Sequence, residues 1–329
     1  MTPRTPSLDQ IARFRRDLDA LAAPIPLGVA VSGGPDSIAL LLLARSACKD
    51  NIRAATIDHG LRPESMAEAA FVADICARLG VPHDTLHVAP GRKGASLQSR
   101  ARAQRYGALA AWARDRGIPA IATAHHIEDQ AETLVMRLAR GSGVSGLAAV
   151  RARSPVPGAQ SPASQLIRPL LSWRRAELAA IVEAARISPV QDPSNADERF
   201  DRARIRRRLA ENSWLDPVPF ARSAAALADA DDALEWVAVD LAAKRIARHD
   251  AFISLQPGGI PAELRRRLVL RCLRIVAPDA APRGEALTAL LGDLSAGQTA
   301  TLAGVKCIGG ECWTFTPAPP RRTKPAASS

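Results

Sequence analysis

A short polar segment between two apolar runs carries the residue types that phosphate chemistry needs. Gly33 and Gly34 permit positive φ angles and a close approach of backbone to ligand, and Pro35 suits the first turn of a helix. The N–H groups of such a turn, with the hydroxyls of flanking serines, favour an anion such as a phosphate. We therefore predict a phosphate-binding loop that reads Ser32, Gly33, Gly34, Pro35, Asp36 and Ser37.

Asp36 places a carboxylate beside the predicted anion site. A carboxylate would repel phosphate unless a cation lay between them, so we interpret Asp36 as an Mg²⁺ ligand or as a group acting in the transition state. A simpler alternative stays open, because a Gly-Gly-Pro turn can be only a turn. The segment is not a Walker A loop, since the spacing and the Lys of that motif are absent.

A second polar segment, residues 122–133 (ATAHHIEDQAET), lies where a predicted strand meets a predicted helix. His125 and Asp129 are four residues apart and would share a helical face if the helix began that early. Two histidines with acids could form a zinc site, but HEXXH spacing is missing. A first helical turn favours acids and would explain Glu128 and Asp129 alone, but not a His-His pair at a strand end.

The pattern around these segments predicts the scaffold that positions them. Strands alternate with helices of ten or more residues, which is typical of an α/β fold with a doubly wound parallel sheet. Ligands bind such sheets outside the carboxyl ends of the strands, where both polar segments fall. The predicted strands are 27–31, 53–58, 82–88, 118–123 and 166–171, and the predicted helices are 8–21, 38–43, 64–79, 95–116, 127–138 and 177–185.

The length of 329 residues predicts two domains. We expect the first domain over residues 1–215 and a smaller, mainly helical domain over 216–316. In the second, helices at about 220–248 and 263–276 precede a Gly- and Thr-rich end, 298–315, that reads as short strands. Residues 154–164 read as an exposed Pro/Ser-rich loop, and 317–329 as a disordered tail.

The composition indicates which kinds of partner and which cellular compartment to expect for this protein. Lys and Arg (44) outnumber Asp and Glu (33), and the net charge of +11 favours a polyanionic partner, a nucleic acid or a membrane surface. Five cysteines without a CxxC pair exclude a disulfide framework and a Cys-rich metal or cluster site. Because the chain shows neither a signal-peptide core nor an apolar run of roughly 20 residues, we expect a cytoplasmic protein that does not enter a membrane.

A series of motifs in chain order resembles the tRNA(Ile)-lysidine synthetase branch of the ATP pyrophosphatase (PP-loop) superfamily. The loop at 32–37 resembles the SGGxDS pyrophosphate loop of the superfamily, and residues 124–133 resemble the AHHxxDQxET of the branch. At 202–207 this chain has RARIRR where members often have RNRIRH, and it has no room for the further C-terminal domain of longer members. The remaining matches are to VDHGLR at 57–62, ARxxRY at 101–106, RGSGxxGL at 140–147, RPLL at 168–171 and DPSN at 192–195.

The resemblance implies a cytoplasmic ligase with a PP-loop catalytic domain. Such an enzyme uses ATP and Mg²⁺ to adenylate the wobble cytidine of an isoleucine tRNA with a CAU anticodon, and free L-lysine then displaces AMP to form lysidine. Codon recognition changes from AUG to AUA as a result. The implied partners are this tRNA and lysine, with no membrane, and a homodimer stays open.

The resemblance also implies roles for single residues. Arg102 and Arg105 would clamp the transferring phosphoryl group, although an ordinary solvated helix face stays an alternative. Asp58 would touch adenosine or, alternatively, cap a helix. The implied catalytic residues are Asp36, which would also hold Mg²⁺, with His125, His126, Arg102 and Arg105. The implied ATP-binding residues are Ser32, Gly33, Gly34, Pro35, Asp36, Ser37, Asp58 and His59, and the residues for tRNA or lysine are Asp129, Glu132, Arg140, Arg206, Arg207 and Arg208.

Two other functions stay open at this point. A PP-loop enzyme that transfers sulfur to tRNA shares the adenylation step, but it usually needs reactive cysteine pairs, and the five cysteines here are not suitably spaced. A non-catalytic ATP-sensing or tRNA-binding protein would be expected to have an altered loop or to lack Asp36. The Arg-rich runs at 199–208 and 265–267 fit a tRNA-binding surface or an ordinary solvated helix face.

Overall fold

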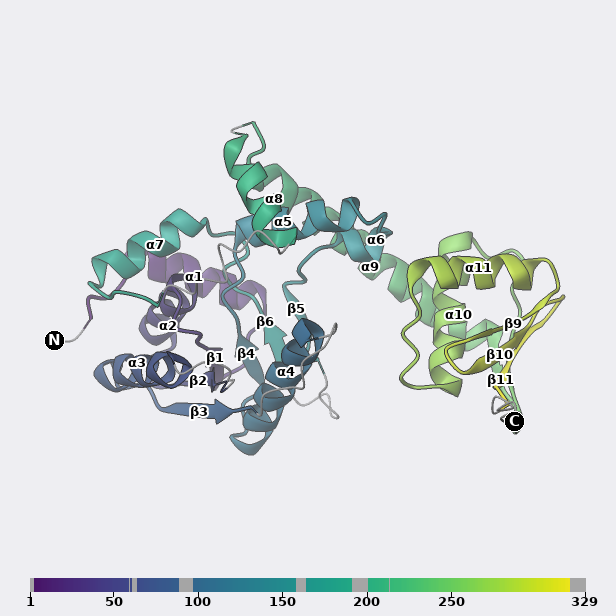
Figure 1. The fold of residues 1–329 in the computed structure, drawn as a ribbon, viewed down its shortest axis with the longest axis horizontal. Helices are drawn as coiled ribbons and strands as arrows, with labels where there is room; N and C mark the ends of the chain where they lie inside the picture. Colours follow the sequence, from purple (N-terminus) through teal and green to yellow (C-terminus); the bar gives the residue numbers. More distant parts are fainter. Residues whose placement is uncertain are drawn as a thin grey trace, which may run out of the picture. The chain divides into compact units, whose positions relative to one another are not determined.

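The computed structural model describes residues 3–58, 60, 64–88, 97–157, 164–190, 201–212 and 214–319. The chain divides into two compact units, one ending at Leu227 and the other beginning at Ala228 (Figure 1). The division falls inside the long helix α9 (Pro217–Arg245), twelve residues or so beyond the boundary expected from the sequence. Each unit has its own hydrophobic core, so each is described by itself.

The first unit is built on a mainly parallel sheet. In the described residues this sheet has six strands in the order β3-β2-β1-β4-β6-β5, and only the edge strand β5 runs antiparallel. Order and direction confirm the predicted doubly wound α/β fold. The strands are β1 (Leu27–Ala30), β2 (Ile52–Asp58), β3 (His83–His87), β4 (Ala120–Ala122), β5 (Arg153–Pro155) and β6 (Gln165–Ile167).

Helices cover both faces of this sheet, as successive strand residues show. Val29 packs in a core with the helices α1, α2, α3 and α7, whereas the next residue, Ala30, packs against the core that α4 supplies. Side chains that alternate between two apolar cores explain why the strands are apolar throughout. The helices are α1 (Leu8–Ala20), α2 (Pro35–Cys48), α3 (Glu64–Leu79), α4 (Leu97–Asp115), α5 (Ile127–Leu138), α6 (Val144–Leu147), α7 (Arg175–Ala184) and α8 (Asp201–Glu211).

The expected loop at 154–164 is partly wrong. Its first residues belong to β5, which pairs with β6, and its last residue, Ser164, is buried and donates its hydroxyl to the Ile118 carbonyl at 2.9 Å. Proline is tolerated in β5 because the strand lies at the sheet edge. Residues 158–163 lie outside the described part of the chain.

The second unit pairs helices with an antiparallel sheet. In the described residues this sheet has five strands in the order β7-β8-β11-β10-β9. The strands at 298–315 and helix α10 were expected, whereas β7, β8 and α11 were not. Beyond α9, the elements are β7 (Ile246–Arg248), β8 (Ile253–Leu255), α10 (Ala262–Val276), α11 (Gly284–Ser295), β9 (Thr299–Leu302), β10 (Val305–Ile308) and β11 (Trp313–Pro317). The expected tail lies outside the described residues from 320 onward.

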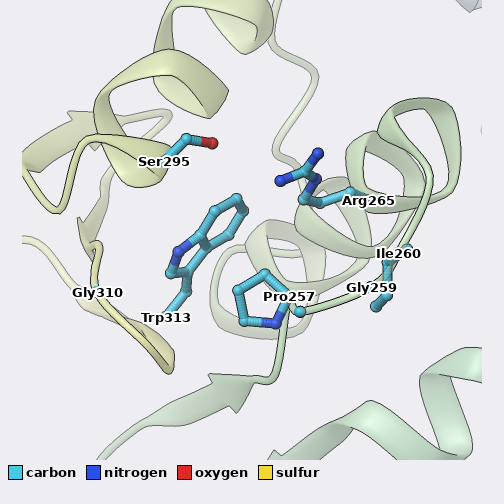
Figure 2. A pocket seen from close by; sticks show the side chains of 8 residues that line it. Pro257, Gly259, Ile260, Arg265, Ser295, Gly310 and Trp313 are labelled. Atoms are coloured by element: carbon cyan, nitrogen blue, oxygen red, sulfur yellow. The ribbon is translucent and has the colours of Figure 1, made fainter.

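The basic run at 265–267 contributes mainly to this unit's interior. Arg267 is buried, and its guanidinium pairs with Asp231 and with Glu263, the latter at 2.9 Å. Arg266 also pairs with Glu263, at 2.7 Å. Arg265 differs, since it lines a small hollow beside Pro257 and Trp313 (Figure 2). The run is therefore not a continuous solvated face, because buried Arg267 joins α10 to Asp231 of α9 and Arg266 pairs within α10.

Candidate active site

The two polar segments meet at one edge of the first sheet. The loop at 32–37 follows β1, and the two histidines follow β4, which is the parallel neighbour of β1. In Figure 1, β2 and β3 lie on one side of β1, and β4 and β6 lie on the other. The strand order therefore reverses here, and open parallel sheets bind their ligands at such a switch point, beyond the carboxyl ends of the strands.

Of the two glycines in the loop, only Gly33 adopts a positive φ, because Gly34 has φ of −73°. Gly33 has φ of +84°, and a Cβ added there would lie 3.3 Å from a methyl group of Val190. Gly34 precedes helix α2, which begins at Pro35. The Ser37 hydroxyl accepts from the Ser32 N–H at 3.1 Å and donates to the Gly34 carbonyl at 2.9 Å. The Ser37 hydroxyl thus fixes the shape of the loop, and its contact with an anion stays a prediction.

Asp36 lies in the first turn of α2, and one of its oxygens has no partner among the residues that the structure describes. Its Oδ2 lies 3.5 Å from Nε2 of His126, whereas its Oδ1 is buried without a hydrogen bond. Burying a carboxylate oxygen in this way costs free energy unless a ligand or ion completes it. The arrangement fits a group whose second partner is a cation.

His126 is a buried cation surrounded by carboxylates. Its side chain is 2% exposed, with Nδ1 at 2.8 Å from Glu128 and Nε2 at 3.6 Å from Asp129. Burial lowers the pKa of His126, but hydrogen bonds to Asp36 and Glu128 and the charge of Asp129 outweigh burial and raise the pKa to about 9. The ring is therefore an imidazolium at neutral pH and offsets part of the negative charge around Asp36.

His125 is held neutral although it is the next residue. Burial is the main reason that its pKa falls to about 4; the charge of Asp129 opposes this shift, and the charge of Arg168 adds to it. Helix α5 begins at Ile127, as predicted, so His125 precedes the helix and does not share a helical face with Asp129. Asp129 instead accepts the backbone N–H of His126 at 3.0 Å, which fixes the turn between strand and helix.

Helix α8 brings arginines to the acids of α5. Glu132 is 1% exposed and receives Arg202 Nε at 2.7 Å and Arg206 Nε at 2.6 Å. Arg202 also reaches Asp129, at 2.6 Å. Since no α8 side chain in the described residues is fully buried, these ion pairs hold the helix to α5.

The comparisons with known proteins agree with this geometry. Residues 8–213 match the family model described as a PP-loop domain. The chain is 48% identical over 316 residues to the tRNA(Ile)-lysidine synthase of Novosphingobium aromaticivorans, with 95% of each chain covered. The chain belongs to the tRNA(Ile)-lysidine synthase family. The tRNA(Ile)-lysidine synthase of Zymomonas mobilis is 43% identical over 305 residues, with 92% of each chain covered.

A solved structure confirms the fold alone. The U34-tRNA thiolase NcsA from Methanococcus maripaludis, determined with its [4Fe-4S] cluster, superposes with a TM-score of 0.54 at 16% identity. The match covers 67% of this chain and 77% of that one. The PP-loop scaffold is therefore shared between the lysidine synthase family and a thiolase, and the residues on it must distinguish their chemistries.

The family motif at 57–62 places Asp58 at the end of β2. Its carboxylate accepts the Gly60 N–H at 2.9 Å and the Ser65 hydroxyl at 2.7 Å, and His87 Nδ1 lies 3.3 Å away. Hydrogen bonds from Gly60 and Ser65 lower the pKa of Asp58. Because α3 begins at Glu64, Asp58 is not its cap. The contact with adenosine stays a prediction, and His59 lies outside the described residues.

The other arginines expected from the family motifs differ in their surroundings. Arg102 and Arg105 are exposed on α4. Arg140 pairs with Asp201 at 2.8 Å, so it joins the end of α5 to the start of α8. The two remaining arginines, Arg207 and Arg208, lie on α8 and are more exposed than Arg206, with Glu211 as an ion-pair partner at 3.5 and 3.3 Å.

Two site residues were missed among the sequence candidates. Arg202 was seen only as part of a basic run, and Arg168 only as the first residue of the RPLL motif. Arg168 follows β6 directly and is 7% exposed, with a hydrogen bond from Nη1 to the Arg151 carbonyl. The available signal was a charged residue within a predicted strand, 166–171, whose other residues are all apolar.

One result bears on the membrane alternative. Among the described helices, none is both long and apolar enough to cross a bilayer.

Proposed function

We propose that this protein is an ATP-dependent tRNA-modifying ligase that converts the wobble cytidine of a CAU-anticodon isoleucine tRNA to lysidine. The observation that carries the proposal is the juxtaposition of the phosphate-type loop, Asp36 and His126 at the switch point of a lysidine synthase family chain. The 2-carbonyl oxygen of cytosine would attack the α-phosphate of ATP and release pyrophosphate. The amine of lysine would then displace AMP.

The charge of each residue in the site indicates its role in this reaction. The N–H groups of the loop at 32–37 bind the leaving pyrophosphate at the start of α2. His126, as an imidazolium, supplies positive charge near the transferring phosphoryl group, and Arg102 and Arg105 supply more from α4. Neutral His125 cannot repel an incoming amine, because it carries no charge at neutral pH.

Asp36 is the residue that would hold Mg²⁺. Its buried Oδ1 lacks a protein partner, which fits a metal ligand. Mg²⁺ is commonly held by one or two carboxylates together with substrate phosphates. When bound, the ion would neutralise charge on the phosphates.

Lysine and tRNA are assigned to the acids and arginines around α5 and α8. Asp129 and Glu132 supply buried carboxylates that suit an ammonium group, and their present partners are guanidinium groups of α8. Arg140, Arg207 and Arg208 present exposed charge for tRNA phosphates. We also propose a homodimer, which sedimentation equilibrium tests directly.

The test of the function is the product. Isoleucine tRNA is incubated with the protein, ATP, Mg²⁺ and lysine, and the nucleosides are analysed by mass spectrometry. The expected product is a cytidine enlarged by lysine minus water, formed only when all components are present. A modified nucleoside that contains sulfur, or no change in mass with folded protein, would refute the proposal.

The exposed arginines of α8 are predicted to contact tRNA phosphates. Changing Arg207 and Arg208 to Ala should weaken tRNA binding and reduce the slope of log K against log salt by roughly 0.7 to 0.9 per lost contact. Adding Arg206→Ala should lower the affinity for tRNA further but change the salt slope little, because Arg206 pairs with Glu132 and holds α8 in place. An unchanged slope in the double variant would mean that Arg207 and Arg208 do not meet phosphate.

The cysteines are predicted to be dispensable, which separates lysidine formation from sulfur transfer. Cys76, Cys272 and Cys307 are fully buried, and burial raises the pKa of each thiol to about 12. None of the five cysteines lies on the segments that form the site. A variant with all five changed to Ala or Ser should incorporate labelled lysine at near wild-type rate, provided that circular dichroism shows it folded. Loss of incorporation in the folded variant would point to a thiolate carrier.

A further inference from the structure

A cluster of two arginines and one tyrosine joins α4 to the residue that follows β6. Arg102, on α4, places its guanidinium carbon 5.0 Å from the centre of the Tyr106 ring. Arg168 forms a hydrogen bond with the side chain of the same tyrosine. Tyr106 and Arg168 are 4% and 7% exposed, whereas Arg102 is exposed. The cluster is thus a buried pair beneath one accessible guanidinium.

The positive charge of this cluster has no carboxylate partner among the described residues. Among the described residues, neither Arg102 nor Arg168 has a carboxylate within ion-pair distance, whereas Arg202 and Arg206 each have one. Arg168 donates Nη1 to the Arg151 carbonyl and the Ser154 hydroxyl, at 2.5 and 3.2 Å, and its buried Nε has no partner. Buried guanidinium groups are normally paired, so an unpaired one next to a second arginine indicates an anion site.

The position of the cluster connects it with the chemistry. Arg168 follows β6, and β6 pairs with β4, with Ile167 opposite Ala122. The chain after Ala122 leads within three residues to His125, whose charge state responds to both Arg168 and Arg102. The carboxylates that face His126 thus come from α2 and α5, whereas the two guanidinium groups come from α4 and from the residue after β6.

We propose that Arg102, Tyr106 and Arg168 form a phosphate-binding site, in which Arg102 meets the phosphate while Tyr106 and Arg168 hold Arg102 in place and add charge from beneath. Planar guanidinium groups match phosphate oxygens, and an anion shared by Arg102 and Arg168, which both contact Tyr106, would offset the repulsion between their charges. The phosphate belongs either to the RNA backbone at the reacting nucleotide or to ATP. This proposal rests on the proposed function only for the identity of the molecule that carries the phosphate.

Tyr106 permits a direct test because it is the single tyrosine of the chain. Protein labelled with ¹³C at the tyrosine Cζ gives one ring resonance, which is followed during titration with an anticodon stem-loop RNA and, separately, with ATP. We expect a saturable shift. A shift with RNA assigns the backbone phosphate, a shift with ATP assigns the nucleotide, and shifts with both assign a site that the two share. No shift with either would overturn the proposal.

Matched variants test whether the change in the Tyr106 resonance comes from a ligand bound at this cluster. Arg102→Gln and Arg168→Gln should each reduce affinity for the assigned ligand about tenfold or more, and for RNA the salt slope should fall by roughly 0.7 to 0.9 in the Arg102 variant. Arg114→Gln, an exposed arginine of the same helix, should change neither. If Arg168→Gln does not fold, the Arg102→Gln variant still tests the proposal. Wild-type affinity of the Arg102→Gln variant for the assigned ligand would overturn it. RNA binding is measured without lysine, so absence of lysidine would refute the function and leave this result standing.

Discussion

Asp36→Asn is expected to lower turnover about 100-fold or more while leaving the fold intact. The substitution preserves size but removes the charge that faces His126 and that would hold Mg²⁺ through the unpaired Oδ1. Losing one preorganised electrostatic group at a reacting centre typically costs a factor of about 10² to 10³. The measurement is the rate of lysine incorporation at saturating ATP and tRNA, across a range of Mg²⁺ concentrations.

A second aspartate provides the control for that measurement. Asp50 follows the same helix, is 89% exposed at its side chain and pairs only with Arg45 among the described residues. Asp50→Asn should therefore leave turnover unchanged, because an exposed ion pair contributes little. If Asp36→Asn kept wild-type turnover at saturating Mg²⁺, the metal role of Asp36 would be refuted.

Glu132→Gln is expected to release helix α8 from α5. Glu132 is 1% exposed and bonds both Arg202 and Arg206, and breaking a buried ion pair on one side commonly costs 3–5 kcal/mol. We expect about 3 kcal/mol, at the lower end of that range, because both arginines stay partly solvated. The loss should register as faster hydrogen exchange of the amides of residues 201–211, since α8 has no buried side chain to retain it.

The matched variant is Glu211→Gln, within α8 itself. Glu211 is half exposed and pairs with Arg207 and Arg208 along the helix surface, so its loss should change exchange in α8 by well under 1 kcal/mol. Equal exchange in the two variants would mean that the buried contacts of Glu132 do not hold the helix. Activity should fall in the Glu132 variant alone, because only that residue touches the site.

The sequence by itself determined where the chemistry lies, because the relevant signals are local. Hydrophobic periodicity is a property of neighbouring residues, so α3 and α5 begin and end where the pattern predicts. Parallel strands carry functional residues at their carboxyl ends, so two polar segments after two buried strands imply one shared edge. The glycine at position 33 likewise permitted the positive φ that the structure shows there.

Tertiary structure alone decided which charges meet and which stay unpaired. Glu132 and Arg206 are 74 residues apart, and no local pattern distinguishes Arg206 from the more exposed Arg207 beside it. The pKa values of two adjacent histidines move in opposite directions, because one faces three carboxylates and the other is buried near arginines. Strand β5 was missed because short edge strands depend on a partner rather than on their own residues. Burial and contacts between distant charges, which only the folded chain defines, determine these pairings and pKa shifts.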